Sequence, residues 1–377
     1  MPPTGVPGDE LDVVFADRSA VNLVEALPHT AVAAATAGLY RVHADGRTTI
    51  VKVLAPAADA PGFWRPGGSE THWYYWRREA EAYGSGMLAT LGGGLRAPRC
   101  LGVFERADGT VALWLEDLRG TAAPAWPVAR YGLAARHLGR AQGEFLSGRP
   151  LPTQPWLSRG WLRTYVARRD RVAGARGGAV DPSVLSDPAA WRHPALAAWV
   201  ADPPIAALRA MRADQPRFLD VLDRLPLTLC HLDLHPANLF DGGAGAGTTT
   251  AVIDWSFAGI GALGEDAGDL VPDAVFDLHV RPDHLADLYD AVAAGYDAGL
   301  RDAAWSGPPE MVRLAMAAAM AAKYVWIAPA LARAVSDERD QLNGRPTAQT
   351  VAAWAPTVRF LLDRTEEARE LTRLVVP

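Results

Sequence analysis

Alternating apolar and polar positions in the first third of the chain predict a small β-sheet. Between Val21 and Leu54 short apolar runs alternate with polar residues, and Asp45-Gly46 separates the last two runs, as in a tight hairpin turn. Two further apolar runs surround a second turn signal at Asp108-Gly109. The pattern therefore predicts a five-stranded antiparallel sheet. Its strands are expected at residues 30–32, 38–43, 48–54, 99–104 and 111–116.

A helical periodicity replaces this alternation over most of the remaining chain. In the segment 72–88, apolar residues and Glu79 recur at helical spacing, which predicts one helix within the sheet region. The pattern indicates an α+β fold of two lobes, a small β lobe over residues 1–117 and a larger, mainly helical lobe over residues 118–377. The helices of the larger lobe are expected at residues 131–146, 156–171 and 194–211, and from about 270 to 375 with breaks at Pro282, Pro308-Pro309, Pro329 and Pro346.

Composition narrows the class of protein. The chain has 377 residues, of which 49% are hydrophobic, and its 37 basic and 43 acidic residues give a net charge of -6, which argues against a nucleic-acid partner. The apolar run 315–322 ends at Lys323 and is too short to span a bilayer, so no membrane partner is expected. Cys100 and Cys230 lack metal-ligand spacing, and the N-terminus lacks a signal peptide. We therefore expect a cytoplasmic protein; the oligomeric state stays open.

The most distinctive polar pattern lies in residues 231–256. It contains His231-x-Asp233-x-x-x-x-Asn238, then a Gly/Ala/Thr-rich turn and an apolar strand that ends at Asp254. Phosphoryl transfer from ATP requires a carboxylate that accepts the proton of the attacking hydroxyl, and oxygen ligands that hold Mg²⁺ against the phosphates. Asp233 suits the first role, and Asn238 and Asp254 suit the second. A hairpin of the apolar residues on either side of the turn would bring Asp254 beside Asn238.

Two charged residues in the sheet region are candidates for phosphate binding. Lys52 lies in an apolar strand, where it is either an edge residue facing water or an ammonium that contacts nucleotide phosphates. Glu79 lies on the apolar face of its predicted helix, and a buried carboxylate needs a partner. That partner is either Lys52, or else Arg78 or solvent. With Asp233 downstream, we favour a Lys52–Glu79 pair at a nucleotide site.

The connection between the two predicted lobes is a third candidate region. The strand 111–116 opens into Glu116-Asp117-Leu118-Arg119-Gly120, an acidic segment that ends in glycine. Its backbone groups are suited to contact the edge of adenine, so Glu116 and Leu118 are candidate nucleotide-binding residues.

Taken together and in this order, these segments resemble the aminoglycoside phosphotransferase-type family of small-molecule kinases, which includes choline, homoserine and ketosamine kinases. The resemblance spans about residues 30–272. The segments that carry it are Thr48-Thr49-Ile50-Val51-Lys52, Arg78-Glu79-Ala80-Glu81-Ala82-Tyr83, Leu115-Glu116-Asp117-Leu118, His231-Leu232-Asp233-Leu234-His235-Pro236-Ala237-Asn238-Leu239, Val252-Ile253-Asp254-Trp255 and Asp269-Leu270.

The resemblance implies a protein-kinase-like fold, Mg²⁺ and ATP as cofactors, and the roles proposed above for the site residues. It further implies that His235 organises the catalytic loop, residues 231–256, and that Asp269 supports this loop through hydrogen bonds. One departure concerns the nucleotide. The segment 33–38, which would cover the phosphates, holds one glycine where protein kinases have several, and this leaves GTP possible as well.

The resemblance leaves the phosphate acceptor open. An acidic wall beside the catalytic loop would favour an amine-bearing hydroxyl compound, such as an aminoglycoside or another amino alcohol, and so a role in antibiotic resistance. The same acids could instead be solvated helix-end charges. The alternatives are a kinase for a neutral sugar or nucleoside, and a nucleotide-binding regulatory pseudokinase. The candidate acceptor residues are Glu265, Asp266, Asp273, Asp277, Trp305, Tyr324 and Trp326.

Overall fold

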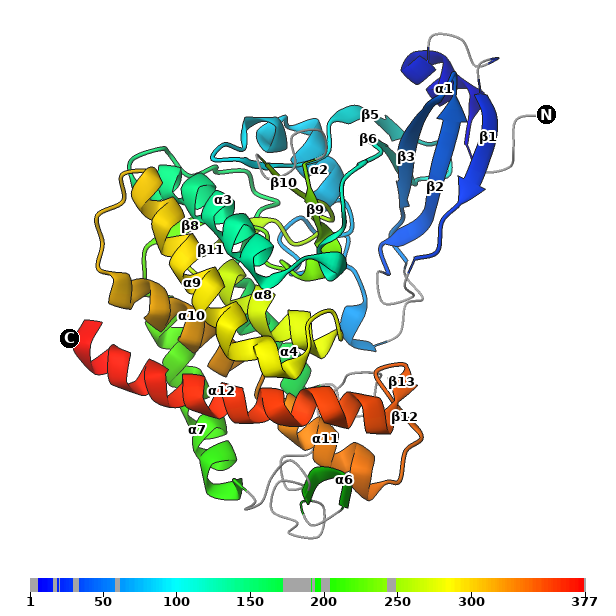
Figure 1. Cartoon of the computed structure of the whole chain (residues 1–377). Coiled ribbons are helices and arrows are strands. Elements are labelled where there is room, and N and C mark those ends of the chain that lie inside the picture. The colour runs from blue at the N-terminus through cyan, green and yellow to red at the C-terminus, as the bar shows by residue number, and fades with distance from the viewer. Residues whose placement is uncertain are drawn as a thin grey trace.

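A β-sheet forms one end of the molecule and a large group of helices forms the other (Figure 1). The computed structural model describes residues 6–15, 19, 21–29, 34–57, 62–171, 191, 194–197, 204–242 and 249–375. The sheet has five antiparallel strands in the order β1-β2-β3-β6-β5, which confirms the predicted α+β architecture. Its strands are β1 (Val21–Ala26), β2 (Thr36–Ala44), β3 (Arg47–Leu54), β5 (Cys100–Glu105) and β6 (Val111–Glu116).

The turns of the sheet are formed by the residues that signalled them in the sequence. Asp45 (φ 48°) and Gly46 (φ 70°) both adopt the left-handed conformation that a two-residue hairpin between β2 and β3 requires. Gly109 (φ 80°) does the same between β5 and β6. The strand expected at 30–32 lies outside the described residues, and the edge strands of the sheet are β1 and β5.

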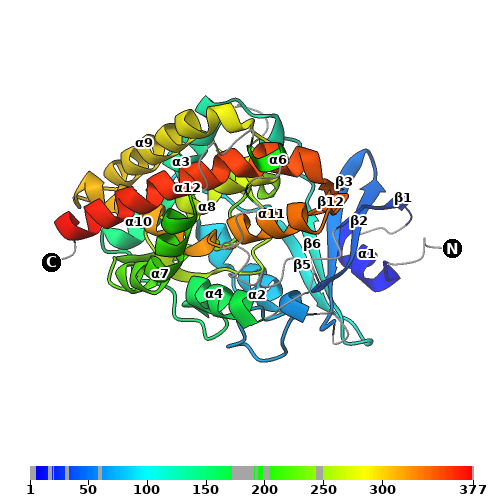
Figure 2. The ribbon, with the colours of Figure 1, turned by 90° about the horizontal axis from the view of Figure 1, so that it is seen from below.

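Helices make up most of the larger lobe, and the longest of them, α12, runs along its outer side (Figure 2). Pro329 does not separate two helices as expected. It lies in the first turn of α11, where a backbone N–H has no helical partner to lose. The helices are α1 (Gly8–Phe15), α2 (Arg78–Gly84), α3 (Val128–Leu146), α4 (Trp161–Arg171), α6 (Pro194–Ala197), α7 (Ile205–Leu222), α8 (Glu265–Phe276), α9 (Leu285–Asp302), α10 (Pro309–Lys323), α11 (Ile327–Ser336) and α12 (Thr347–Val375).

The helix expected over residues 72–88 is much shorter in the structure. Only α2 (Arg78–Gly84) is α-helical, because the residues before it follow an irregular path that packs aromatic rings against the larger lobe. The rings of Trp73 and Tyr74 lie 5.7 and 4.9 Å from that of Phe257. This packing prevails over the helical periodicity of the segment, and Gly86 (φ 74°) ends it on the other side.

Two short sheets, β4-β10-β9 and β7-β11-β8, hold the segment 231–256 in place. β8 precedes this segment and pairs with β11 beyond it, and β9 and β10 form the predicted hairpin inside it. β4 pairs with β10, so a part of the predicted small lobe is bonded to the larger one. We retain the lobe boundary at residue 117 as a proposal, since β6 ends at Glu116. The short strands are β4 (Leu95–Arg96), β7 (Ser158–Arg159), β8 (Leu227–Cys230), β9 (Leu239–Asp241), β10 (Thr250–Val252), β11 (Gly259–Ala262), β12 (Gln341–Leu342) and β13 (Arg345–Pro346).

The core of the larger lobe surrounds α10, whose residues from Ala315 to Ala322 are fully buried. The segment Pro309–Ser336 is long and apolar enough to span a membrane, with a mean hydropathy of 1.5, but 89% of that window is buried inside the protein. α3 and α9 lie side by side (Figure 1) at a distance that needs glycine. A Cβ on Gly139 would stand 2.2 Å from the carbonyl oxygen of Tyr296.

Candidate active site

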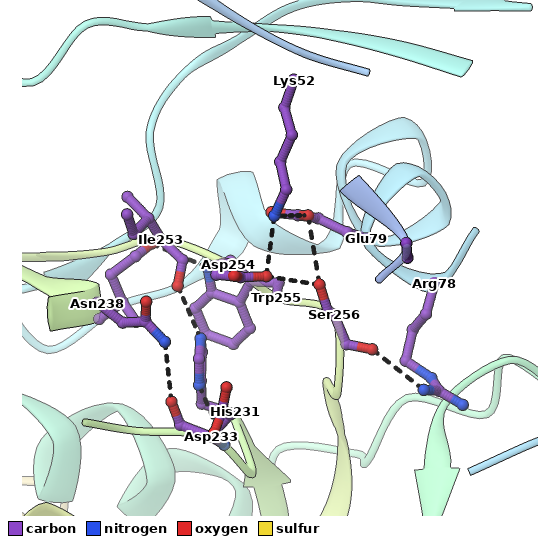
Figure 3. A network of polar contacts seen from close by, with 12 residues as sticks. Lys52, Arg78, Glu79, His231, Asp233, Asn238, Ile253, Asp254, Trp255 and Ser256 are labelled. Atoms are coloured by element: carbon purple, nitrogen blue, oxygen red, sulfur yellow. Dashed lines mark hydrogen bonds and ion pairs between the residues drawn. The ribbon is translucent and has the colours of Figure 1, made fainter. Parts of the chain in front are cut away.

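Residues far apart in the sequence meet where the sheet faces the larger lobe. Lys52 comes from β3, Glu79 from α2, and Asp254 follows β10 (Figure 3). The Nζ atom of Lys52 lies 2.6 Å from Oε2 of Glu79 and 2.9 Å from Oδ1 of Asp254. The two interpretations of Glu79 are thereby decided by geometry, because Glu79 pairs with Lys52 and not with Arg78.

Burial and charge act together on this group. The side chain of Glu79 is 2% exposed, that of Lys52 10% and that of Asp254 30%. Burial alone would lower the pKa of Lys52, but the carboxylates of Asp254 and Glu79 outweigh burial and raise it above its ordinary value. Burial alone would raise the pKa of Asp254, yet Lys52 and the Ser256 hydroxyl hold it below its usual range. Lys52 and Asp254 are thus both charged at neutral pH.

The loop that carries Asp233 has a strained backbone held by His231. Leu232 (φ 65°) adopts a left-handed conformation that costs a non-glycine residue energy, as Asp254 (φ 61°) does further on. Nδ1 of His231 accepts the N–H of Asp233 at 3.3 Å, so Nε2 carries the ring proton and donates to the carbonyl oxygen of Ile253 at 2.9 Å. This ring therefore links the Asp233 loop to the strand before Asp254.

Asp266 gives the loop a second support. Its carboxylate is fully buried and accepts the backbone N–H of His231 at 2.8 Å and of Leu232 at 2.7 Å. The expectation that Asp269 supports the loop is wrong, because its carboxylate pairs with Lys323 at 2.7 Å. The expectation for His235 stays a prediction, which its backbone supports: its N–H donates to the carbonyl oxygen of Asp233 at 3.1 Å, and its carbonyl oxygen accepts the N–H of Asn238 at 2.9 Å.

The support from Asp266 is itself anchored in the helical lobe. Nε2 of Gln142, on α3, donates to Asp266 at 2.8 Å, and the hydroxyl of Tyr296, on α9, donates to Oε1 of Gln142 at 2.5 Å. The close packing of α3 and α9 thus fixes the backbone on either side of the catalytic loop. Sequence reasoning missed Gln142 and Tyr296, since nothing in their local pattern distinguishes them from other core residues.

The predicted metal ligands have the chemistry that Mg²⁺ prefers. Nδ2 of Asn238 donates to the carbonyl oxygen of Asp233 at 3.0 Å, which occupies the amide nitrogen and leaves the amide oxygen free as a ligand. The Asp254 carboxylate supplies a second, charged oxygen. Within the described residues no group of three His, Cys, Asp or Glu could hold a metal. One carboxylate and one amide fit an ion that takes its other ligands from phosphates and water.

The acidic side chains of the connection between the lobes form ion pairs with arginines. Glu116 forms hydrogen bonds with both Nη atoms of Arg96, at 2.8 and 3.1 Å, so its carboxylate is not free for a nucleotide. Asp117 pairs with Arg41 of β2 at 2.9 Å. The backbone of Leu118 makes no hydrogen bond to the described part of the chain. The contact of its backbone with a nucleotide stays a prediction.

Only some of the expected acceptor residues lie beside the catalytic loop. Glu265 and Asp266 are buried and bond to backbone N–H groups, so they are not part of an acidic wall, which corrects that expectation. Trp305 lies next to Arg301 at the end of α9. Asp273 and Asp277, in contrast, are close enough to Asp233 and His235 for the charges to interact.

Other groups surround these two carboxylates. Lys323 lies 3.8 Å from Asp273, and the hydroxyl of Tyr324 donates to the backbone carbonyl oxygen of Asp269 at 3.3 Å. Arg345 approaches Asp277 at 3.8 Å from β13. The half-buried Trp326 packs against Phe276, with ring centroids 5.2 Å apart. The acidic wall thus consists of Asp273 and Asp277.

A protein-kinase-like fold in which a Lys–Glu–Asp group faces an Asp–Asn loop defines the class of kinase-like phosphotransferases. The sequence profile described as "APH: Phosphotransferase enzyme family" matches residues 34–306. The chain belongs to this family, and it is a small-molecule phosphotransferase that acts on hydroxyl groups. No curated protein sequence matches the chain significantly.

A solved structure with a TM-score above 0.5 agrees with this fold. An amicoumacin kinase, hAmiN, in complex with AMP-PNP, Ca²⁺ and Ami is similar at a TM-score of 0.54 and 12% identity, covering 97% of this chain and 92% of that one. Spectinomycin phosphotransferase APH(9)-Ia, in complex with ADP and spectinomycin, has a TM-score of 0.48 and 9% identity over 94% and 97% of the two chains. The choline kinase LicA from Streptococcus pneumoniae has a TM-score of 0.47 and 13% identity over 94% and 97%.

Proposed function

We propose that the protein is an Mg·ATP-dependent kinase that phosphorylates a hydroxyl group of an amine-bearing small molecule. The observation that carries the proposal is the Lys52–Glu79–Asp254 ion network beside the Asp233–Asn238 loop. The family membership supports phosphoryl transfer, and the geometry supports a part for each of these residues in it.

Each residue has a distinct task in this proposal. Lys52, held by Glu79, orients the nucleotide phosphates, and the backbone at Glu116 and Leu118 contacts the base. Asn238 and Asp254 hold Mg²⁺, which would neutralise charge on the phosphates.

Asp233 accepts the proton of the acceptor hydroxyl as the hydroxyl oxygen bonds to the γ-phosphorus of ATP and the bond from that phosphorus to the bridging oxygen of ADP breaks, which gives a phosphate ester and ADP. Catalysis is then mainly positioning and charge neutralisation, and the strained loop conformation is maintained by Asp266 and His231.

The charge beside Asp233 supports an amine-bearing acceptor. Asp273 and Asp277 add two carboxylates on the acceptor side, and their nearest cations are Lys323 and Arg345. Since Lys323 already pairs with Asp269 at 2.7 Å, the wall keeps an excess of negative charge. Such a wall attracts ammonium groups and gives neutral sugars or nucleosides no comparable gain. An aminoglycoside-like or other amino-alcohol antibiotic would fit, and its phosphorylation would confer resistance.

A panel of acceptors tests the proposal directly. Purified protein with Mg²⁺ and either ATP or GTP is offered aminoglycosides, smaller amino alcohols, neutral sugars and nucleosides, and nucleotide consumption is measured with phosphorus NMR of the products. We expect turnover with amine-bearing acceptors and a phosphate ester on their hydroxyl. Turnover restricted to sugars or nucleosides would establish the alternative substrate class. Nucleotide binding without any turnover would favour a regulatory pseudokinase. Absence of nucleotide binding would exclude both a kinase and a nucleotide-binding pseudokinase.

The acidic wall predicts a pH dependence of acceptor binding. Burial and the neighbouring Asp273 raise the pKa of Asp277 to about 6. Above this pH the carboxylate is charged and attracts an ammonium; below it the carboxylate is neutral and the attraction is lost. The KM of an amine-bearing acceptor should therefore increase as the pH falls through about 6.

The Asp277→Asn variant separates this effect from those of Asp233, Asp273, His235 and Arg345, which also face the wall. It should raise the KM at pH 8 about tenfold, the value of one charge-assisted hydrogen bond, and flatten the dependence on pH. The exposed Asp290→Asn on α9 serves as a control. An unchanged KM in Asp277→Asn would show that the wall does not bind the amine.

A further inference from the structure

Arg78, the residue before Glu79, is fully enclosed although it carries a charge. Its side chain belongs to the first turn of α2, and the residue is 1% exposed. Its guanidinium donates four hydrogen bonds, all to backbone carbonyl oxygens. The acceptors are Trp156 (2.7 Å, from Nε), Trp73 (3.0 Å, from Nη1), Ser256 (3.1 Å, from Nη1) and His72 (2.7 Å, from Nη2).

Burying the Arg78 cation in this way costs desolvation free energy. No carboxylate in the described chain forms an ion pair with Arg78, and burial lowers its pKa to about 10. A buried charge without an ion partner is stable only if its donors are satisfied, and four carbonyls satisfy them here. An apolar residue would fill the same space without that cost, so the arrangement calls for a reason beyond packing.

The carbonyl groups come from segments on both sides of the active site. His72 and Trp73 belong to the aromatic segment before α2, and Trp156 precedes β7 in the larger lobe. Ser256 is two residues beyond Asp254, and its hydroxyl donates to Asp254 at 2.5 Å. Figure 3 shows the Arg78 guanidinium bonded to Ser256 on the side of that residue away from Lys52.

We propose that Arg78 is a positioning residue that sets the distance between the Lys52–Glu79 pair and the metal-binding Asp254. It holds the backbone at Ser256 from within the same helix turn that carries Glu79. A shift of α2 would therefore move Asp254 as well, so the distance between the Lys52–Glu79 pair and Asp254 would stay the same. The inference rests on the proposed function, since it assigns Arg78 a part in the same phosphoryl transfer.

The planar fork of arginine is essential to this role. It directs N–H groups at four acceptors in fixed directions, whereas a lysine ammonium has three donors at one point. Arg78→Lys keeps the charge but cannot reach all three segments. We expect this variant to fold, to lose about tenfold to a hundredfold in kcat through misplacement of the reacting groups, and to need more Mg²⁺ for half-maximal rate.

A purely structural role would leave a different signature, and Arg106→Gln provides the comparison. Arg106 is another nearly buried arginine, bonded to Glu10 at 2.6 and 2.9 Å, beside α1 on the sheet. Both variants should lower the melting temperature. Arg78→Lys alone should lower kcat per folded molecule, raise the Mg²⁺ requirement, and accelerate amide hydrogen exchange in residues 254–258.

The outcomes separate this inference from the proposed function. If Arg78→Lys matches wild type in kcat and in the exchange of residues 254–258, or if Arg106→Gln shows the same losses, Arg78 does not position the site. If wild type binds no Mg·AMP-PNP in calorimetry, the proposed function fails, while the exchange comparison still decides whether Arg78 holds the Asp254 segment. Arg78→Gln keeps a planar but neutral donor. Its amide exchange in residues 254–258 should be faster than in wild type and slower than in Arg78→Lys, and this result would support the role of the planar group.

Discussion

Replacing Asp233 by asparagine should lower kcat by about 10²–10⁴-fold, the usual contribution of a general base. Asparagine keeps the shape and polarity of the side chain but cannot accept the proton of the acceptor hydroxyl. The backbone bonds that hold the loop, from Asp266 to His231 and Leu232, do not involve the Asp233 side chain and should persist. Steady-state kinetics with the acceptor found in the panel, together with calorimetry of Mg·AMP-PNP, measures both properties.

The control for this experiment is Asp287→Asn, which makes the same substitution at an exposed position on α9. It should retain the wild-type rate. Nucleotide affinity should be nearly unchanged in Asp233→Asn, because Lys52, Asn238 and Asp254 remain. A variant that binds nucleotide normally and also turns over at the wild-type rate would remove Asp233 from the mechanism. Loss of nucleotide binding in Asp233→Asn would instead indicate a damaged loop. In that case Asp233→Ala should also lose nucleotide binding.

Much of the fold could be predicted because its signals are local. The Asp45-Gly46 turn fixes the β2–β3 hairpin through the conformations of two residues, and β9 and β10 follow from apolar runs around a polar turn. Lys52 and Glu79 were paired correctly for a more physical reason. Each is a charge on an apolar face, and two such charges are stable in a core only if they meet.

The errors arose where long-range packing decides the outcome. Nothing in the sequence reveals that Trp73 and Tyr74 pack on Phe257, and this contact shortens the predicted helix to α2. Asp266 and Asp269 are one turn apart on α8, so they point in similar directions. Which of them reaches the catalytic loop depends on the position of α8 relative to β8, and local periodicity cannot supply that position.

Hydrogen bonds to backbone carbonyl groups were the other feature that the sequence pattern could not predict. The role of Arg78 depends on carbonyl groups, and a carbonyl group is the same whatever residue carries it. A pattern of side chains therefore shows a charge on a helix but not which backbone segments surround it. The same applies to Asn238, whose amide nitrogen bonds to the carbonyl of Asp233. Such contacts explain why the identity of a site is readable in a sequence while its rigidity is not.

Replacing Lys52 by methionine should have two separable effects. Removing a phosphate-orienting charge from the site should reduce kcat by about 10²–10³-fold. The same change leaves Glu79, 2% exposed, as a buried carboxylate without a cation, which should cost about 3–5 kcal/mol of unfolding free energy. Urea unfolding and steady-state kinetics measure the two effects on one protein.

The double variant Lys52→Met/Glu79→Leu distinguishes them. An apolar pair of similar volume removes the buried charges together, so most of the lost unfolding free energy should return. Asp254 keeps 30% of its side-chain surface exposed and retains its bond from Ser256, so it tolerates the loss of Lys52. Turnover should stay as low as in Lys52→Met, because no ammonium faces the phosphates. Recovery of both stability and rate would mean that Lys52 serves the fold alone, and recovery of neither would mean that Asp254 depends on Lys52 for its charge.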